Sequence, residues 1–127
     1  MKKPRIDEQA VVADGAVVLG DVTIEKDVSI WYNAVIRGDV NSISIGEGTN
    51  IQDLAVLHVD ADASLAIGKN VTIGHGAILH GCTIKDQALI GMGAIVLNGA
   101  VIGKGSMIAA GALVLQNTGV KINPSSK

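Results

Sequence analysis

Aliphatic residues recur at every sixth position along most of the chain. From Ile84 the sequence reads IKDQAL IGMGAI VLNGAV IGKGSM IAAGAL VLQNTG, and an Ile or Val opens each block. Repetition at a fixed short period is the signature of a solenoid, in which each repeat stacks on its neighbours. The same frame runs through three earlier series, namely Val12, Val18, Ile24, Ile30 and Ile36, then Ile45, Ile51 and Leu57, then Ile67, Ile73 and Leu79.

This period predicts an all-β fold, a single-stranded parallel β-helix of hexapeptide repeats. Three hexapeptides form one triangular turn, so we expect about five to six coils stacked at the strand spacing of roughly 4.8 Å. We assign one domain to residues 1–127, with repeats over about 11–116 and a short irregular tail over 117–127. About three extra residues follow Ile36, about four follow Leu57, and one is missing after Leu79.

The composition agrees with a narrow interior. Hydrophobic residues make up 48% of the chain, yet aromatic residues make up 2% and phenylalanine is absent. A conventional core of this size uses aromatic rings because each ring buries a large area. The inward positions must therefore hold Ile, Val, Leu and Ala. The 16 glycines then fit the corners, where the backbone needs unusual φ and ψ values.

The hexapeptide count assigns the outward residues to three faces, because hexapeptides three apart stack on one face. The first face presents Leu19, Arg37, His58, His80, Leu97 and Leu115. The second face presents Trp31, Gln52, Gly74, Gly91 and Ala109, with Tyr32, Asp53, His75, Met92 and Ala110 beside them. The third face presents Glu25, Gly46, Gly68, Lys85 and Gly103, followed by Lys26, Glu47, Lys69, Asp86 and Lys104.

Only the third face has the mixed charge of a solvated surface. Apolar patches as large as the first and second faces are seldom left exposed on a monomer. We therefore expect a homotrimer in which each chain turns these two faces inward, as a closed three-fold ring with heterologous contacts.

Charge and cysteine content narrow the class of protein further. The formal net charge is −2 at pH 7, so no broad basic surface points to nucleic acid. The single cysteine excludes an intrachain disulfide, and we interpret Cys82 as a small corner or core residue. No signal peptide or membrane span is recognisable, and we expect a cytoplasmic protein without membrane contact.

All three histidines lie in the middle coils. His58 and His80 share a face and a position one coil apart, so their rings can converge on one ion. His75 lies on another face, separated from His80 by about 15 Å of extended chain. The alternatives are polar interface residues or a histidine ladder. We favour a metal site completed by His75 of a neighbouring copy, since three imidazoles with an open fourth position form a catalytic zinc site.

Four segments together resemble the gamma-class carbonic anhydrase family. They are RGD (37–39), GTNIQD (48–53), LHVD (57–60) and IGHGAILHGCTI (73–84). The resemblance implies a left-handed β-helix trimer with metal sites shared between adjacent subunits. It implies that His58 and His80 come from one subunit and His75 from the next. The implied metal is Zn²⁺, with Fe²⁺ or Co²⁺ as alternatives.

The resemblance also implies roles for five polar residues. Arg37 and Asp53 are similar to an ion pair between subunits, and Asp39 to the acidic residue beside it. Gln52 is similar to the side chain that orients the metal-bound hydroxide, and Asn50 to a supporting polar group. A subunit ion-pair network without a role in turnover is the alternative for Arg37, Asp39 and Asp53.

The chain departs from the family pattern at three places. Val40 replaces a glutamate, the loop VDADAS (59–64) has no glutamate to shuttle protons, and LQNTGVKINPSSK ends the chain where relatives continue into a C-terminal helix. We thus expect hydration of CO₂ to bicarbonate by a metal-bound hydroxide at subunit interfaces, with turnover limited by proton transfer. The alternatives are a hexapeptide-repeat acyltransferase, a thioesterase-like enzyme and a catalytically weak trimeric metal-binding scaffold.

Overall fold

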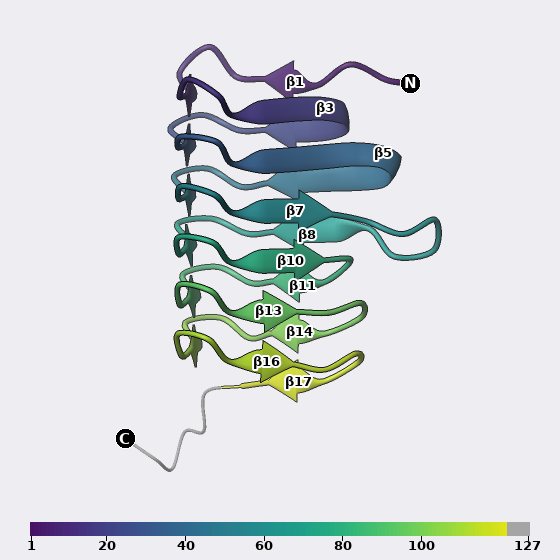
Figure 1. Ribbon diagram of the computed structural model, residues 1–127, viewed down its shortest axis with the longest axis vertical. Helices are drawn as coiled ribbons and strands as arrows, with labels where there is room; N and C mark the ends of the chain where they lie inside the picture. The colour runs from purple at the N-terminus through teal and green to yellow at the C-terminus, as the bar shows by residue number, and fades with distance from the viewer. Residues whose placement is uncertain (122–127) are drawn as a thin grey trace.

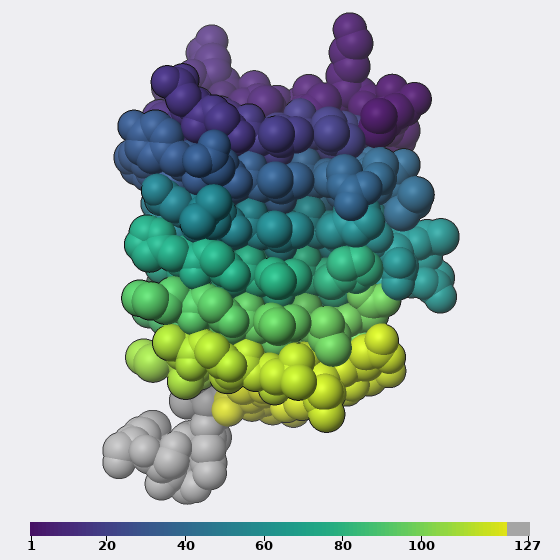
Figure 2. All heavy atoms as spheres, in the orientation of Figure 1, coloured from purple at the N-terminus to yellow at the C-terminus, as the bar shows by residue number. Residues whose placement is uncertain are grey.

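The computed structural model describes residues 1–121, which wind into a left-handed parallel β-helix of about six turns (Figure 1). Every paired strand in these residues runs parallel to its neighbours, and the chain advances along the helix axis from N-terminus to C-terminus. Figure 2 shows successive coils as stacked layers, with one loop projecting in the teal part of the chain. The predicted all-β solenoid is confirmed.

Most strands are only two or three residues long because each hexapeptide contributes about half of its residues to a flat side of the coil and the rest to a corner. The strands are β1 (Arg5–Ile6), β2 (Val11–Val12), β3 (Val17–Ile24), β4 (Ser29–Ile30), β5 (Val35–Ile45), β6 (Asn50–Ile51), β7 (Val56–His58), β8 (Leu65–Ile67), β9 (Thr72–Ile73), β10 (Ile78–His80), β11 (Thr83–Ile84), β12 (Leu89–Ile90), β13 (Ile95–Val96), β14 (Val101–Ile102), β15 (Met107–Ile108), β16 (Leu113–Val114) and β17 (Gly119–Val120).

The strands build the three predicted faces. The second face is a sheet of its own, in the order β15-β12-β9-β6-β4-β2. The first and third faces are joined into one sheet, because the long strands β3 and β5 pass around a corner from one face to the other. The first face follows β16-β13-β10-β7 to β5, and the third continues from β5 through β8, β11, β14 and β17.

Strand register confirms the hexapeptide count. Leu57 pairs with Ile36 on one side and with Leu79 on the other. The same column continues into the last coils, where Leu79 pairs with Val96. The three interruptions in the frame therefore leave the stacking of the inward residues intact.

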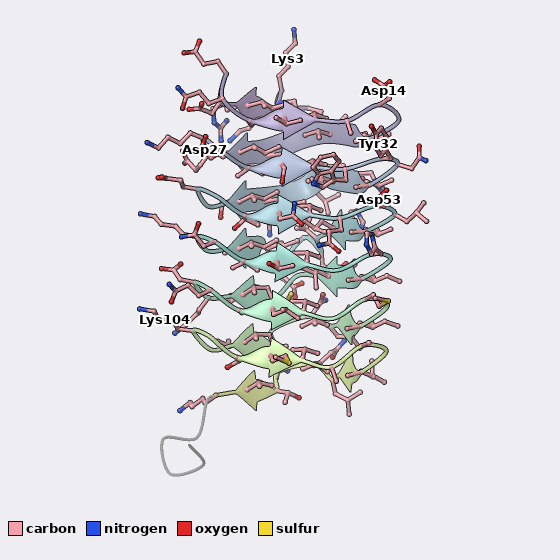
Figure 3. All side chains as sticks on the ribbon, turned by 90° about the vertical axis from the view of Figure 1, so that its left-hand side faces the viewer. Lys3, Asp14, Asp27, Tyr32, Asp53 and Lys104 are labelled. Atoms are coloured by element: carbon pink, nitrogen blue, oxygen red, sulfur yellow. The ribbon has the colours of Figure 1, made fainter. Side chains whose placement is uncertain are left out.

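The interior is a column of aliphatic side chains. The largest fully buried side chains are all Ile or Leu, including Ile30, Ile51 and Leu79. The aromatic residues Trp31 and Tyr32 lie outside this column, and Tyr32 is half exposed. Figure 3 shows Tyr32 on the edge of the prism that also carries Asp14 and Asp53. The cross-section of each coil thus explains the absence of phenylalanine.

The interruptions take two structural forms. The residues after Ile36 do not form a separate loop, because β5 continues without a break to Ile45. The residues after Leu57 form the loop 59–64, which leaves the prism between β7 and β8 (Figure 1). A short backbone bridge between Asp60 and Ala63 closes this loop.

The strands extend beyond the predicted repeats at both ends. β1 lies before residue 11 and pairs with β3, while β17 lies after residue 116 and pairs with β14. Ile6 and Val120 continue the six-residue frame, which explains both additions. Residues 122–127 of the predicted tail lie outside the described residues.

Several corners adopt left-handed backbone conformations supported by the next coil. Gly48 has a φ of 76°, and a Cβ atom there would lie 2.2 Å from the Oδ1 atom of Asn70. Gly99 has the same relation to Asn117, at 2.0 Å. Each asparagine carboxamide therefore packs against a glycine one coil earlier, so these corners require glycine for both φ and space.

No helix among residues 1–121 is long and apolar enough to cross a membrane.

We expect an aromatic ring in the interior to destabilise the fold. Ile84 is 1% exposed and lies on the third face, away from the histidines. The Ile84→Phe variant should lose about 1–3 kcal/mol of unfolding free energy because overpacking displaces the neighbouring coils. Ile84→Leu conserves volume and should lose less than about 1.5 kcal/mol. Urea unfolding at one fixed protein concentration measures both, and equal stability of the two variants would contradict the narrow interior.

Candidate metal centre

Two histidines meet on the first face at the ends of adjacent strands. His58 ends β7 and His80 ends β10, and the two residues are direct partners in the parallel register. The Nδ1 atom of His58 lies 3.2 Å from the Nε2 atom of His80. The rings meet at 74°, with centroids 5.1 Å apart. The pairing predicted from the hexapeptide count is therefore confirmed.

The outer nitrogen of each ring has its own partner. The Nε2 atom of His58 lies 2.9 Å from Oδ1 of Asp39, and the Nδ1 atom of His80 lies 2.6 Å from Oδ1 of Asn98. The hydrogen bond with His58 lowers the pKa of the Asp39 carboxyl below its ordinary value. Arg37 lowers it further, against desolvation that raises it. An ionised Asp39 only accepts hydrogen bonds, so His58 donates from Nε2.

The same reasoning applies to His80. The Nδ2 atom of Asn98 donates to a carboxylate oxygen of Asp60 at 2.5 Å, which leaves the Oδ1 atom of Asn98 to accept from His80. In their neutral forms His58 therefore keeps a lone pair on Nδ1 and His80 keeps one on Nε2. These two atoms are the pair separated by 3.2 Å. Two lone pairs face each other at a distance where a cation between them would relieve their repulsion.

This geometry fits a tetrahedral metal ion. Zinc–nitrogen distances of about 2.0–2.1 Å place two imidazole ligands about 3.3–3.4 Å apart in a tetrahedral site. The observed separation of 3.2 Å is close to that value. Ligating histidines in proteins usually donate their second N–H to a carboxylate or carbonyl oxygen, as both rings do here. The donor set is thus suited to zinc or a similar divalent metal.

The third histidine lies elsewhere in the same chain. His75 follows β9 on the second face, and its side chain is 56% exposed. Its Nδ1 atom lies 3.6 Å from Oδ1 of Asp53, which belongs to the coil above. Within residues 1–121 of one chain, no group of three His, Cys, Asp or Glu side chains is arranged to hold a metal ion.

The remaining predicted site residues divide between the two faces. On the first face, Nη1 of Arg37 donates to Oδ2 of Asp39 at 2.6 Å. On the second face, Nδ2 of Asn50 donates to Oγ of Ser29 at 2.6 Å. Gln52 lines an apolar groove of about 340 Å³ on the second face. The chain therefore brings Arg37 and Asp39 to the histidine pair but keeps Asn50, Gln52 and Asp53 with His75.

Sequence reasoning missed two residues of the centre, Asn98 and Asp60. Asn98 follows Leu97 on the first face, so the face assignment contains the signal that places it one coil beyond His80. Asp60 reaches Asn98 through the path of the loop 59–64, and the six-residue repeat does not predict that path.

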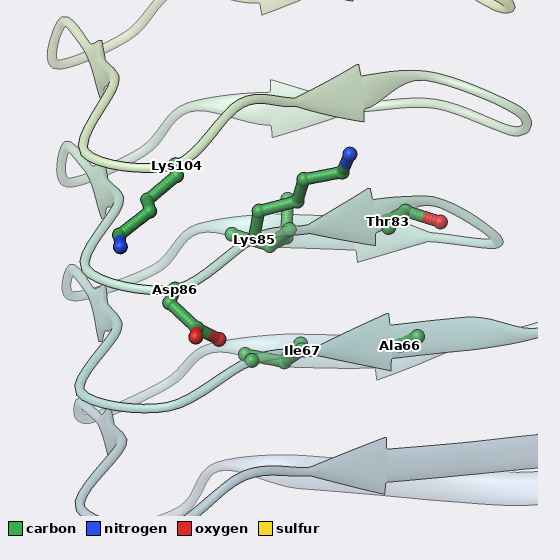
Figure 4. A pocket seen from close by; sticks show the side chains of 8 residues that line it. Ala66, Ile67, Thr83, Lys85, Asp86 and Lys104 are labelled. Atoms are coloured by element: carbon green, nitrogen blue, oxygen red, sulfur yellow. The ribbon is translucent and has the colours of Figure 1, made fainter.

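The three faces differ in what they expose. The first face exposes Ile78, Leu113 and Leu115, and the second exposes Leu89, Met92 and Met107. On the third face, Lys26 and Glu47 form an ion pair at 3.8 Å. A depression of about 340 Å³ on this face is lined in part by Lys85, Asp86 and Lys104, whose side chains are drawn in Figure 4. The predicted solvated wall is present, and it lies away from the histidine pair.

Comparison with known proteins identifies the family of the chain. The gamma carbonic anhydrase 1 of Arabidopsis thaliana mitochondria is 54% identical over 126 residues, which cover 94% of this chain and 46% of that protein. The chain belongs to the gamma carbonic anhydrase family. A carbonic anhydrase of Geobacillus kaustophilus is 46% identical over 97 residues, which cover 76% of this chain and 53% of that protein. Family membership implies a metal cofactor in general terms.

Further comparisons support the fold. The bacterial transferase hexapeptide family, defined by six repeats, matches residues 81–116. A Bacillus cereus protein of known crystal structure is 48% identical with a TM-score of 0.93, and the match covers 94% of this chain and 69% of that one. The chain spans about half the length of the carbonic anhydrases that it matches.

We expect the thiol of Cys82 to be inert in the folded protein. The residue is 1% exposed, and burial raises the pKa of its thiol to about 12. At pH 8 only about one thiol in ten thousand would be ionised, and the thiolate is the reactive form. Ellman's reagent should therefore label native protein far more slowly than protein in urea. Equal labelling rates would contradict the buried position.

Proposed function

We propose that this chain binds a divalent metal ion between copies of a homotrimer and hydrates CO₂ to bicarbonate. The metal is zinc, with iron(II) or cobalt(II) as alternatives. The observation that carries the proposal is the pair of imidazole nitrogens 3.2 Å apart whose outer nitrogens already have hydrogen-bond partners. The family relationship supplies the reaction.

The exposed apolar side chains support the trimer. Ile78, Leu113 and Leu115 lie on the first face and Leu89, Met92 and Met107 on the second, while the third face carries ion-paired charges. A three-fold ring that covers both faces would bring the first face of one copy against the second face of the next. That contact would set His75 of one copy beside His58 and His80 of its neighbour. It would also allow Arg37 and Asp53 to pair between copies.

In this proposal the chain's own residues have distinct tasks. His58, His80 and His75 of a neighbouring copy hold the metal ion, and Asp39 fixes the ring of His58. When bound, the metal supplies the Lewis acidity that makes hydroxide available from water near neutral pH. Gln52, on the same face as His75, is the amide that would orient the attacking oxygen, with Asn50 as a supporting polar group.

Proton removal is the step that this chain supports least. Val40 is 57% exposed where the family pattern has a glutamate, and the loop 59–64 has no glutamate. We therefore propose slow turnover in which the buffer accepts the proton.

The test combines mass, metal content and activity. The purified chain should have about three times its mass of 13.0 kDa in solution, and it should bind about one zinc ion per chain. Stopped-flow acidification should then detect CO₂ hydration after zinc loading and after anaerobic iron(II) loading. His80→Ala and His75→Ala should each lower zinc content several-fold and abolish hydration, because each removes one of three ligands.

Lys85→Ala on the third face is the matched control and should leave mass, zinc and rate unchanged. A monomer at micromolar concentration would refute the shared site. Full zinc content in His75→Ala would refute the third ligand, and zinc binding without hydration would leave a metal-binding scaffold.

A further inference from the structure

Asp60, Asn98 and His80 form a continuous hydrogen-bonded chain that ends at the histidine pair. Asp60 lies in the loop after β7, and Asn98 follows β13. The Oδ2 atom of Asp60 accepts from Nδ2 of Asn98 at 2.5 Å, and Oδ1 of Asn98 faces Nδ1 of His80 at 2.6 Å. Two residues, one from a loop and one from the next coil, thus act on the ring of His80.

The order of groups in this chain gives it a direction. A carboxylate offers no proton, so it holds the amide with its NH₂ group toward Asp60 and its oxygen toward His80. The amide oxygen can only accept, so His80 must carry its proton on Nδ1. Without Asp60 the amide of Asn98 could turn over. Without Asn98, the lone pair on Nδ1 of His58, 3.2 Å from Nε2 of His80, would favour the opposite Nε2–H tautomer.

Hydrogen bonds to the backbone of the loop hold Asp60 in place. The Nδ2 atom of Asn41 on β5 lies 3.1 Å from the backbone oxygens of both Asp60 and Ala61 and donates to them. Backbone hydrogen bonds of 3.1 Å join Asp60 and Ala63 in both directions. The side chain of Asp60 is exposed, so its position depends on these loop contacts.

A glycine makes room for the contact. Gly81 directly follows His80 with a φ of 56°. A Cβ atom at this position would lie 2.5 Å from Oδ1 of Asn98 and 2.8 Å from Cβ of Ala63. The hexapeptide that is one residue short after Leu79 and the loop inserted after Leu57 therefore contact each other beside His80.

We propose that Asp60 and Asn98 are positioning residues that fix His80 in the Nδ1–H tautomer and aim its Nε2 lone pair at Nδ1 of His58. The benefit to metal binding rests on the proposed function, whereas the selection of the tautomer does not. Partners in the outer shell of a metal site typically change metal affinity about 10- to 100-fold when removed.

The first readout is the tautomer itself. Two-bond ¹H–¹⁵N correlation spectra of the metal-free full chain at pH 8 should show His80 protonated on Nδ1. In Asn98→Leu and Asp60→Asn this preference should weaken or reverse. The matched control, Asp62→Asn, makes the same charge change in the same loop and should leave the spectrum of His80 unchanged.

A double variant tests the direction of the chain. With D60N and N98D together, the new amide at position 60 can donate to the new carboxylate at position 98, which still accepts from His80. The double variant should restore the Nδ1–H tautomer that D60N alone weakens.

The second readout is zinc affinity, measured by competition with a chromophoric chelator. Asn98→Leu should bind zinc about 10- to 100-fold more weakly, and Asp62→Asn should bind it as the unmodified chain does. An Nε2–H tautomer in the unmodified chain, or an unchanged tautomer in both Asn98→Leu and Asp60→Asn, would contradict the proposed positioning of His80 by Asp60 and Asn98. If the tautomer responds as expected but zinc content and hydration are absent, the positioning role of Asp60 and Asn98 would stand and the proposed function would fail.

Discussion

The parallel ladder between successive coils is the constraint on which the rest of the structure depends. It fixes a residue in one coil at the strand spacing from its equivalent in the next, so columns of like position run along the prism. One column is the aliphatic core that contains Ile36, Leu57 and Leu79. Another, directly beside it, pairs His58 with His80. The register that packs the core therefore also brings the two rings together.

The same ladder keeps His75 away from this pair. The outward residues are distributed over the three flat sides of the prism. His75 and His80 are five residues apart, and this spacing places them on different sides. A compact site with three histidines then requires a second copy of the chain. The exposed apolar residues of the first and second faces give a physical reason for such an assembly, since covering them removes apolar surface from water.

Much of this organisation could be predicted from the sequence. The six-residue frame predicted the solenoid, the three faces and the pairing of His58 with His80, because stacking depends only on counting. The frame could not predict that β5 would continue through the extra residues after Ile36, since both a loop and a longer strand fit the count. Nor could it place Asp60, whose position depends on Asn41 and on the closed loop 59–64. The shared metal site remains a prediction because it lies between copies.

The fold alone does not define the reaction. The hexapeptide family that matches residues 81–116 is described as a bacterial transferase family, and that range contains none of the three histidines. The relationship to carbonic anhydrases extends over 94% of the chain and includes the histidine-bearing coils. The case for carbonic anhydrase chemistry thus rests on the middle coils, and the case for the β-helix rests on the whole chain.

Co-assembly of two defective chains tests the shared site most directly. A His58→Ala chain retains His75, and a His75→Ala chain retains the His58–His80 pair. Refolding equal amounts together should give about one zinc ion per four chains, since each mixed trimer completes one site. Mixing His58→Ala with His80→Ala should restore none, because no chain then holds both rings. Zinc recovery in neither mixture, or equally in both, would contradict a metal site built from two copies.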